Sequence, residues 1–282
     1  IDGQGRVRTL LGGIDHTKAP YNRAVAARRQ AGSAWKPFVY LAALEAGRTP
    51  ELAVIDEPVT IGNWTPRNYE DGFLGPMTLE MALAKSVNTV AARLADEVGR
   101  DNVAAAARRL GVASPLNTDP AMALGSAGVS PLEMSQAYAA FANGGDRVSA
   151  YGIERIRTAS GVVLYRRPAA APQPAISNPA LSDLNRMMRT VMTSGTGTRA
   201  AVPGYDLAGK TGTTSDYKDA WFVGHTGGLA VAVWMGRDDA TPMAGITGGT
   251  APAELWRSFM TTALKRSPAR PIPYGRPAPE PV

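Results

Sequence analysis

The residues with the clearest chemical potential in this chain are Ser33 and Lys36, a hydroxyl and an amine three positions apart. Apolar residues recur with helical spacing after Lys36, and Pro37 is tolerated only near a helix start, so we predict a helix that begins within a residue or two of Ser33. Three residues are nearly one turn, which brings the amine to the same face as the hydroxyl. The first backbone N–H groups of a helix lack partners and lie at its positive end. This arrangement predicts a serine nucleophile, a lysine base and an anion-stabilising helix terminus, as acyl transfer requires.

A lysine accepts a proton only in its neutral form, which is scarce at neutral pH. With an ordinary pKa of ~10.4, the neutral form of the amine lies about 4.6 kcal/mol above the protonated form at pH 7. Burial and a neighbouring positive charge both lower the pKa of a lysine. Burial in a cleft and the like charge of a second lysine would therefore suit Lys36 to act as a base.

Two short segments downstream of Ser33 complete a set of three. They are Ser86-Val87-Asn88, with a Ser-x-Asn pattern, and Lys210-Thr211-Gly212, and each pattern occurs once in the chain. A further segment, Ser215-Asp216-Tyr217-Lys218, repeats the Ser-x-x-Lys spacing, but it lies in a polar stretch that no apolar helix follows. We interpret it as a loop with a solvated lysine. The three segments in this order predict one catalytic site.

The three segments and their surroundings resemble the transpeptidase domain of class A (bifunctional) penicillin-binding proteins. The resemblance extends over roughly residues 1–264. It is carried by Arg29-Gln30-Ala31-Gly32-Ser33, Trp64-Thr65-Pro66-Arg67-Asn68-Tyr69, Gly75-Pro76-Met77-Thr78-Leu79, Ala139-Ala140-Phe141-Ala142-Asn143-Gly144-Gly145, Gly209-Lys210-Thr211-Gly212-Thr213-Thr214 and Asp219-Ala220-Trp221-Phe222-Val223-Gly224. Trp35 is a mild departure, since the family more often has Phe, Thr or Leu there, and we expect it to alter packing but not chemistry.

The resemblance implies a role for each residue in the cleavage of a peptidoglycan stem peptide. Ser33 is expected to attack the carbonyl of the penultimate D-Ala, with Lys36 as the base, so that an acyl-enzyme forms as the terminal D-Ala leaves. Ser86 relays the proton to the departing amine, and Asn88 bonds the amide of the acyl chain.

The third segment is expected to hold the substrate. Lys210, Thr211 and Thr213 bind its terminal carboxylate, and Gly212 lets its backbone lie against the strand, where a side chain would block it. The backbone N–H groups of Ser33 and Thr213 form the oxyanion hole, in which one donor is typically worth about 2.7–4 kcal/mol.

The implied reaction is the D,D-transpeptidation that cross-links stem peptides. Its partners are a D-Ala-D-Ala donor, an amine acceptor and, as covalent inhibitors, β-lactam antibiotics. The resemblance also implies a place on the extracytoplasmic (periplasmic) face of the cytoplasmic membrane, with an anchor that precedes this chain. Two alternatives stay open: a D,D-carboxypeptidase, which uses water as acceptor, and a β-lactam sensor, which is acylated and signals.

A serine β-lactamase is disfavoured because it needs a glutamate that activates water for deacylation. In that family a Glu-x-x-Leu-Asn motif lies between the second and third segments. The glutamates in this interval are Glu97, Glu133 and Glu154, and none of them begins such a motif. We therefore expect slow deacylation and accumulation of β-lactam esters.

Composition narrows the possible chemistry. The 282 residues include no cysteine, which excludes a thiol nucleophile. They include two histidines, His16 and His225, and this small number argues against a Ser-His-Asp triad or a His-rich zinc site. We assign both histidines to turns and expect no metal and no cofactor. The net charge of +6 comes from scattered arginines, which we interpret as solvated surface and not as a nucleic-acid-binding face. No apolar run approaches the ~20 residues that span a bilayer.

Turn signals and hydrophobic periodicity predict the elements that position these segments. Residues 1–13 have the pattern of a strand hairpin, and Val59-Thr60-Ile61 that of a short strand. Thr78 and Ser130 are expected to cap helices, the latter in a capping box with Glu133. Strands are predicted at 151–157, 162–165, 207–213, 219–223 and 229–235, and helices at 101–110, 181–192 and 251–264. The inward face of the last helix is predicted to hold Leu255, Trp256, Phe259, Met260 and Ala263.

Strands near both ends of the chain with helices between them predict an α+β fold in three layers, α/β/α. The first and last parts form an antiparallel sheet of about five strands covered by helices, as in penicillin-binding proteins and serine β-lactamases, and residues 38–145 form roughly an all-helical lobe. We expect one transpeptidase domain over residues 1–266 and a Pro-rich C-terminal tail over 267–282. The active site should lie between the sheet and the lobe.

Overall fold

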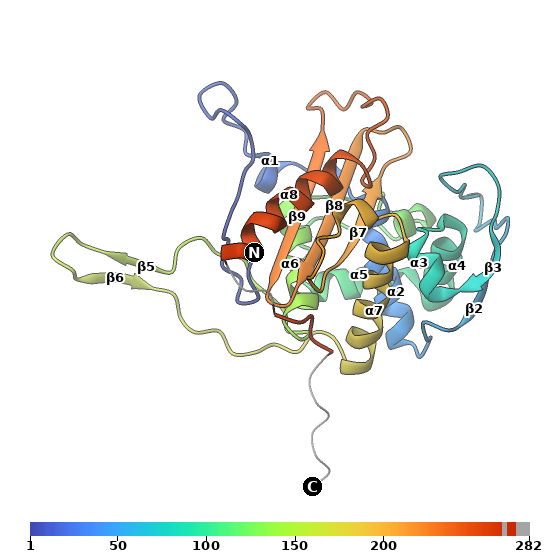
Figure 1. Ribbon diagram of the computed structural model, residues 1–282, viewed down its shortest axis with the longest axis horizontal. Helices are drawn as coiled ribbons and strands as arrows, with labels where there is room; N and C mark the ends of the chain where they lie inside the picture. The colour runs from blue at the N-terminus through green and yellow to red at the C-terminus, as the bar shows by residue number, and fades with distance from the viewer. Residues whose placement is uncertain (267–269, 275–282) are drawn as a thin grey trace, which may run out of the picture.

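The computed structural model describes residues 1–266 and 270–274, and Figure 1 shows its ribbon. The helices are α1 (Arg23–Ala26), α2 (Lys36–Glu45), α3 (Leu79–Ala84), α4 (Asn88–Val98), α5 (Arg100–Arg109), α6 (Pro131–Ala142), α7 (Asn178–Ser194) and α8 (Ala251–Arg266), with 3-10 turns η1 (Gly32–Trp35), η2 (Pro120–Leu124) and η3 (Thr198–Ala200). The strands are β1 (Arg29–Gln30), β2 (Ala53–Asp56), β3 (Gly75–Thr78), β4 (Gly128–Val129), β5 (Arg155–Arg157), β6 (Val163–Arg166), β7 (Ala208–Thr213), β8 (Asp219–Thr226) and β9 (Leu229–Gly236).

The largest sheet of the described residues is antiparallel and has the strand order β7-β8-β9. Successive side chains of a strand point to opposite faces. In β8, Trp221 and Val223 therefore pack into the main hydrophobic core, whereas Phe222 packs into a second, smaller core on the other face. Both faces of the sheet are apolar, so each needs a helical cover.

Helices α8 and α6 cover opposite faces of this sheet, as Figure 1 shows. On α8, Trp256 is fully buried with its ring 5.1 Å from that of Phe222. On α6, Tyr138 and Phe141 are fully buried in the main core together with Trp221. Helix, sheet and helix thus form the three-layer α/β/α arrangement expected from the sequence.

Helix α2 runs through the centre of the molecule. Its residues from Lys36 to Leu44 are all buried, and it contacts α4, α5 and α7. A helix that is buried on every side belongs to a protein interior rather than to a surface. The lysine at its first position is consequently surrounded by core and not by solvent.

Two helix starts follow the local signals in the sequence. Thr78 caps α3, with its hydroxyl accepting from Met81 N, and Ser130 caps α6 in the predicted capping box with Glu133. The strand pairs β5–β6 and β7–β8–β9 and the helices α5, α7 and α8 also lie where periodicity predicts them. These predictions are confirmed to within a few residues.

Several predictions for the first third of the chain are wrong. Residues 1–13 form a tight turn, in which Asp2 N donates to Arg6 O at 3.0 Å, but not the predicted two-stranded hairpin. Asp2 bridges instead to Leu229 and Arg6 to Tyr151, so the extended residues pair with distant parts of the chain. The largest sheet accordingly has three strands, not about five. Residues 59–61 contribute one isolated bridge from Ile61, while the strand of that region is β2. Turn signals locate bends, but they do not identify the partner of an extended segment.

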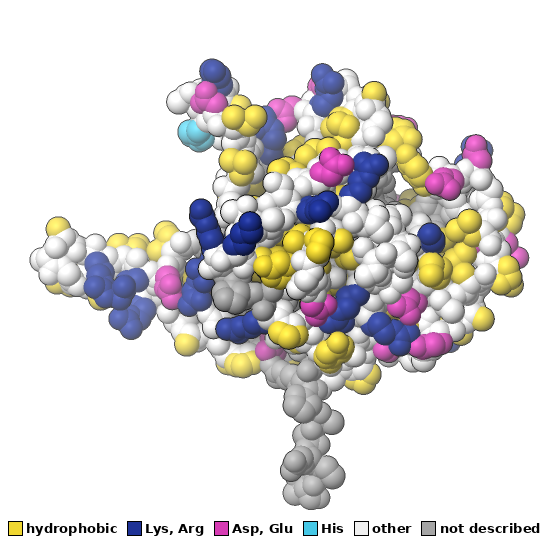
Figure 2. All heavy atoms as spheres, viewed as in Figure 1, with side chains coloured by type: hydrophobic (Ala, Val, Ile, Leu, Met, Phe, Trp, Pro, Cys, Tyr) yellow, Lys and Arg dark blue, Asp and Glu magenta, His cyan; other side chains and the backbone are white. Residues whose placement is uncertain are grey.

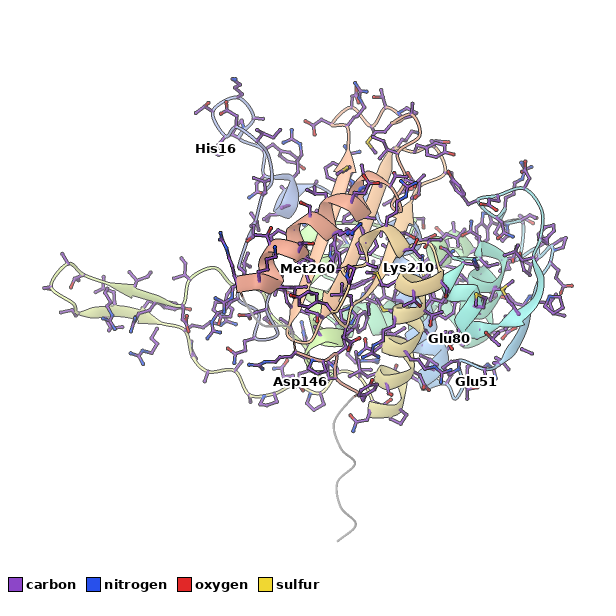
Figure 3. The ribbon with its side chains drawn as sticks, in the orientation of Figure 1. His16, Glu51, Glu80, Asp146, Lys210 and Met260 are labelled. Atoms are coloured by element: carbon purple, nitrogen blue, oxygen red, sulfur yellow. The ribbon has the colours of Figure 1, made fainter. Side chains whose placement is uncertain are left out.

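Two side chains also lie elsewhere than predicted. Leu255 is 51% exposed on α8, so the inward face is formed by Trp256, Met260 and Leu264. His225 lies buried in β8 and not in a turn, with its ring Nε2 2.9 Å from Asn185 Oδ1. Burial lowers the pKa of His225 to about 3, so this ring is neutral. His16 does lie in a turn, on a loop that stands away from the body in Figure 3.

The hairpin of β5 and β6 projects from the body, and every residue of both strands is exposed. Figure 2 shows it with yellow apolar side chains and dark blue basic ones. Of the predicted tail, residues 267–269 and 275–282 lie outside the described residues. The described part packs against the domain: Arg270 bridges to Gly227, and Ile272 is fully buried.

Candidate active site

Ser33 lies in η1, the 3-10 turn that leads directly into α2. Gly32 has a φ of +53°, and a Cβ added there would lie 2.6 Å from Thr213 O, so glycine is required for this close approach of η1 to β7. The hydroxyl of Tyr138 donates to Ala34 O at 2.7 Å and anchors the turn from α6. Ser33 itself is partly exposed, and within the described residues its hydroxyl makes no hydrogen bond.

The Lys36 amine reaches from the first position of α2 to the turn between α3 and α4. Nζ donates to Ser86 O and to Asn88 Oδ1, both at 2.6 Å, and lies 3.2 Å from Ser86 Oγ. The side chain is fully buried. The first two segments identified in the sequence therefore meet through this amine.

Lys210 approaches the same serine from β7. Its Nζ donates to Ser86 Oγ at 2.9 Å and lies 3.2 Å from Thr211 O. Lys210 is fully buried, and Figure 3 labels it near the middle of the view. Two amines from segments 174 positions apart (210 minus 36) thus converge on one hydroxyl.

The environment of the two lysines favours their neutral forms. Burial lowers the pKa of Lys36 well below its ordinary value, and the charge of Lys210 lowers it further. Burial lowers the pKa of Lys210 to about 7. The requirement for a neutral base near neutral pH is thus met mainly by desolvation, and the like charge adds to it.

Ser86 is held in a strained backbone conformation, with a φ of +60°. This left-handed region is rare for residues other than glycine, asparagine and aspartate. The residue follows α3 and precedes the first turn of α4, so the bend between the two helices directs the serine hydroxyl at both amines. Such strain is frequent at functional sites, where surrounding contacts maintain it.

Strand β7 is an edge of its sheet, and its open side faces η1. Thr214 N donates to Asp219 O at 3.1 Å, and bonded and non-bonded pairs alternate along an antiparallel ladder. The neighbouring pair, Thr213 and Ala220, is therefore a non-bonded one. The Thr213 N–H consequently points away from β8, in the direction that the predicted oxyanion hole needs.

The threonine hydroxyls of β7 contact two segments that sequence reasoning did not assign. Thr211 Oγ1 lies 2.7 Å from Thr196 Oγ1, and Thr213 Oγ1 accepts from Gly248 N at 3.0 Å. Thr196 lies in a glycine- and threonine-rich stretch after α7, which was the only signal for it in the sequence.

Gly212 has a structural role that the sequence did not indicate. A Cβ added there would lie 2.3 Å from Ala31 O and 2.9 Å from Ala34 Cβ. This close backbone approach is made by the segment that carries Ser33. Gly212 therefore sets the distance between the nucleophile and β7.

A central buried helix with a serine and a lysine at its start, facing the edge of an antiparallel sheet, is the architecture of penicillin-binding transpeptidase domains. The sequence model described as "Penicillin binding protein transpeptidase domain" matches residues 5–260, and the chain belongs to this family. The structure is similar to that of PonA1 from Mycobacterium tuberculosis, with a TM-score of 0.88 and 28% identity over 100% of this chain and 81% of that one. PonA1 has also been solved in complex with penicillin V.

Two relatives illustrate the sequence similarity. Penicillin-binding protein 1A of Neisseria meningitidis is 39% identical over 280 residues, which cover 93% of this chain and 34% of that protein. Penicillin-binding protein 1A of Pseudomonas aeruginosa is 33% identical over 94% of this chain and 39% of its own length. The chain therefore spans little more than a third of these relatives. Among the described residues, no helix is long and apolar enough to cross a membrane.

Proposed function

We propose that this chain is a serine-type D,D-transpeptidase domain in which Ser33 forms an acyl-enzyme with a D-Ala-D-Ala stem peptide. The observation that carries the proposal is the pair of buried amines, Lys36 and Lys210, at 3.2 and 2.9 Å from the hydroxyl of Ser86. Burial of two neighbouring amines lowers the stability of the fold, and such groups are found mainly where they take part in catalysis or binding. Family membership supports the same reaction class.

In the acylation step, Lys36 acts as the base. A neutral amine has two N–H donors and one lone pair, and its donors face Ser86 O and Asn88 Oδ1, each at 2.6 Å. In this proposal the lone pair takes the Ser33 proton as Oγ bonds to the carbonyl carbon. The N–H groups of Ser33 and Thr213 stabilise the oxyanion that forms.

The tetrahedral intermediate then collapses with cleavage of the C–N bond to the terminal D-Ala. The departing nitrogen needs a proton, and Ser86 supplies it while taking the one held by Lys36. Lys210 donates to Ser86 Oγ at 2.9 Å and so keeps this hydroxyl in place for the relay. The acceptor amine attacks the ester by the same steps in reverse.

Hydrolysis of the ester should be slow because no glutamate between Asn88 and Lys210 is free to activate water. Glu97 pairs with Arg48, Glu154 with Arg6, and Glu133 accepts from Ser130 N at 2.8 Å and Ser114 N at 2.7 Å. β-Lactam esters should therefore persist.

The substrate's terminal carboxylate should bind to the hydroxyls of Thr211 and Thr213, above the Lys210 amine. Extended substrate backbone fits the open edge of β7, whose N–H groups alternate in direction. We place this chemistry on the extracytoplasmic face of the cytoplasmic membrane, where peptidoglycan is cross-linked, with the membrane anchor and any second activity carried by other parts of a longer protein.

Intact mass after incubation with a penicillin tests the proposal. The wild type should gain one penicillin mass and Ser33→Ala none. Lys36→Ala should fold and bind without forming the ester at neutral pH. An adduct that survives Ser33→Ala would overturn the assignment of the nucleophile.

Product analysis separates the alternatives. With a stem-peptide donor ending in D-Ala-D-Ala and an amino-acid acceptor, a transpeptidase yields a peptide extended by the acceptor. A carboxypeptidase yields only the shortened peptide, and a sensor yields neither but still forms the penicillin ester.

A further inference from the structure

Helix α4 begins at Asn88 without a capping side chain of its own. Its N-cap residue is Val87, which offers no side-chain acceptor. The acceptor comes instead from a distant loop, because Asn88 N donates to Asn68 Oδ1 at 2.9 Å. An acceptor at this point satisfies one of the unpaired N–H groups of the first turn and fixes where the helix begins. Asn68 therefore positions the backbone of Asn88.

The same loop fixes the side chain of Asn88. Asn88 Nδ2 donates to Arg67 O at 2.7 Å, which turns the amide oxygen toward Lys36 Nζ at 2.6 Å. The orientation matters because an amide can present either an acceptor or a donor. A reversed amide would donate to the Lys36 lone pair and occupy the position needed for the Ser33 proton.

Asn68 is held in turn by Asp56, the last residue of β2. Asp56 is 1% exposed, and its two oxygens accept from Asn68 Nδ2 at 2.9 and 3.0 Å. It also accepts from Leu74 N at 2.7 Å and from the hydroxyl of Thr89 in the first turn of α4. A carboxylate offers only acceptors, so it draws the NH₂ group of Asn68 toward itself and directs Asn68 Oδ1 at Asn88.

We propose that Asp56 and Asn68 are positioning residues that keep the amide oxygen of Asn88 on the Lys36 amine and thereby set the efficiency of proton transfer from Ser33. The inference rests on the proposed function and deepens it. Asp56 sets the polarity of the Asn68 amide, and Asn68 holds the backbone of Asn88. The carbonyl of Arg67, next to Asn68 in the same loop, then directs the Asn88 amide oxygen at Lys36.

The first test compares Asn68→Ala with a matched control, Asn143→Ala. Asn143 is also a partly buried asparagine whose amide donates to two carbonyls, those of Gly3 and Asp146, but it lies outside the site. The second-order rate constant for acylation by a fluorescent penicillin should fall about 10- to 100-fold in Asn68→Ala, as it does when a residue that orients a metal ligand is removed. It should change less than about twofold in the control. Equal losses in the two variants would overturn the proposal.

A second test exchanges the two partners. Asn68→Asp alone places two carboxylates in contact and should acylate at least as slowly as Asn68→Ala. Adding Asp56→Asn restores one donor and one acceptor at this link, since the new amide in β2 can donate to the new carboxylate in the loop, which in turn accepts from Asn88 N. The double variant should recover most of the lost rate. A double variant as slow as Asn68→Asp would contradict the proposed polarity of the chain.

A direct readout at Lys36 does not depend on acylation. Loss of an acceptor disfavours the charged amine, so the pKa of Lys36, followed by NMR of the labelled side chain, should fall in Asn68→Ala. It should stay unchanged in Asn143→Ala. An unchanged Lys36 pKa with wild-type acylation would refute the positioning role and leave the proposed function intact. A wild type that forms no ester would refute the proposed function, while the Lys36 comparison would still decide the positioning role.

Discussion

Replacement of Lys210 by methionine should raise the free energy of unfolding at neutral pH while it impairs acylation. The pKa of this buried amine is about 7 in the folded protein against an ordinary value of 10.5. One pKa unit is worth about 1.4 kcal/mol, so the difference between 10.5 and 7 corresponds to about 5 kcal/mol. The lost hydrogen bonds to Ser86 Oγ and Thr211 O offset this by about 1 kcal/mol each.

The sign of the pH dependence follows from proton binding. Between pH 7 and 10.5 the unfolded chain holds the proton on Lys210 and the folded protein has released it, so wild-type stability rises with pH in this window. Below pH 7 Lys210 is protonated in both states, so the wild type carries the full free-energy cost of burying the charged amine. The stability advantage of Lys210→Met should therefore be largest at pH 7 and below, and shrink by about 1.4 kcal/mol per pH unit above it. Lys36 adds to the stability advantage of Lys210→Met. Loss of the neighbouring charge should let the pKa of Lys36 rise toward its ordinary value, which lowers the cost of burying this amine.

Urea denaturation of the wild type and Lys210→Met at a series of pH values from 6 to about 9.5 measures this difference. Groups that titrate equally in both proteins cancel, which leaves the contribution of Lys210 and its effect on Lys36. A stability difference independent of pH would refute the reasoning, because it would mean that the folded protein holds the Lys210 proton as firmly as the unfolded chain does.

Three further predictions concern the backbone and packing around the site. Ser86→Gly and Ser86→Ala should both slow acylation at least about 100-fold, because both remove the proton relay. The free energy of unfolding should be about 1 kcal/mol higher for the glycine variant than for the alanine variant, because φ is +60° at this position. Gly212→Ala should cost about 1–3 kcal/mol in urea denaturation and separate η1 from β7, which penicillin labelling would detect; Gly152→Ala, where a Cβ meets no atom within 4 Å, should do neither. Tyr138→Phe should cost about 1–2 kcal/mol because its hydroxyl donates to the backbone of η1, whereas Tyr40→Phe should be neutral or stabilising, since within the described residues the Tyr40 hydroxyl is buried without a partner. A Tyr40→Phe variant that loses as much stability as Tyr138→Phe would contradict this account.

The sequence alone determined the features that depend on a few neighbouring residues. The cap at Thr78 and the capping box at Ser130 are local hydrogen bonds, so their residue types predict them. The continuous apolar runs of β8 and β9, separated by a glycine-containing turn, indicated the strands of the sheet for the same reason. Three short segments sufficed to indicate the chemistry, because each carries its reactive groups at a fixed local spacing.

Tertiary structure alone decided which distant groups meet. The burial of Lys36 and Lys210 against Ser86, the pairing of Asp2 with Leu229, and the buried place of His225 depend on contacts between segments far apart in the chain. The support of Asn88 by Asn68 has no local signature, because the cap of α4 comes from a loop 20 positions away (88 minus 68). Short-range patterns fix dihedral preferences and hydrogen bonds within a turn, whereas desolvation and the direction of an amide are fixed only when the remaining chain has packed around them.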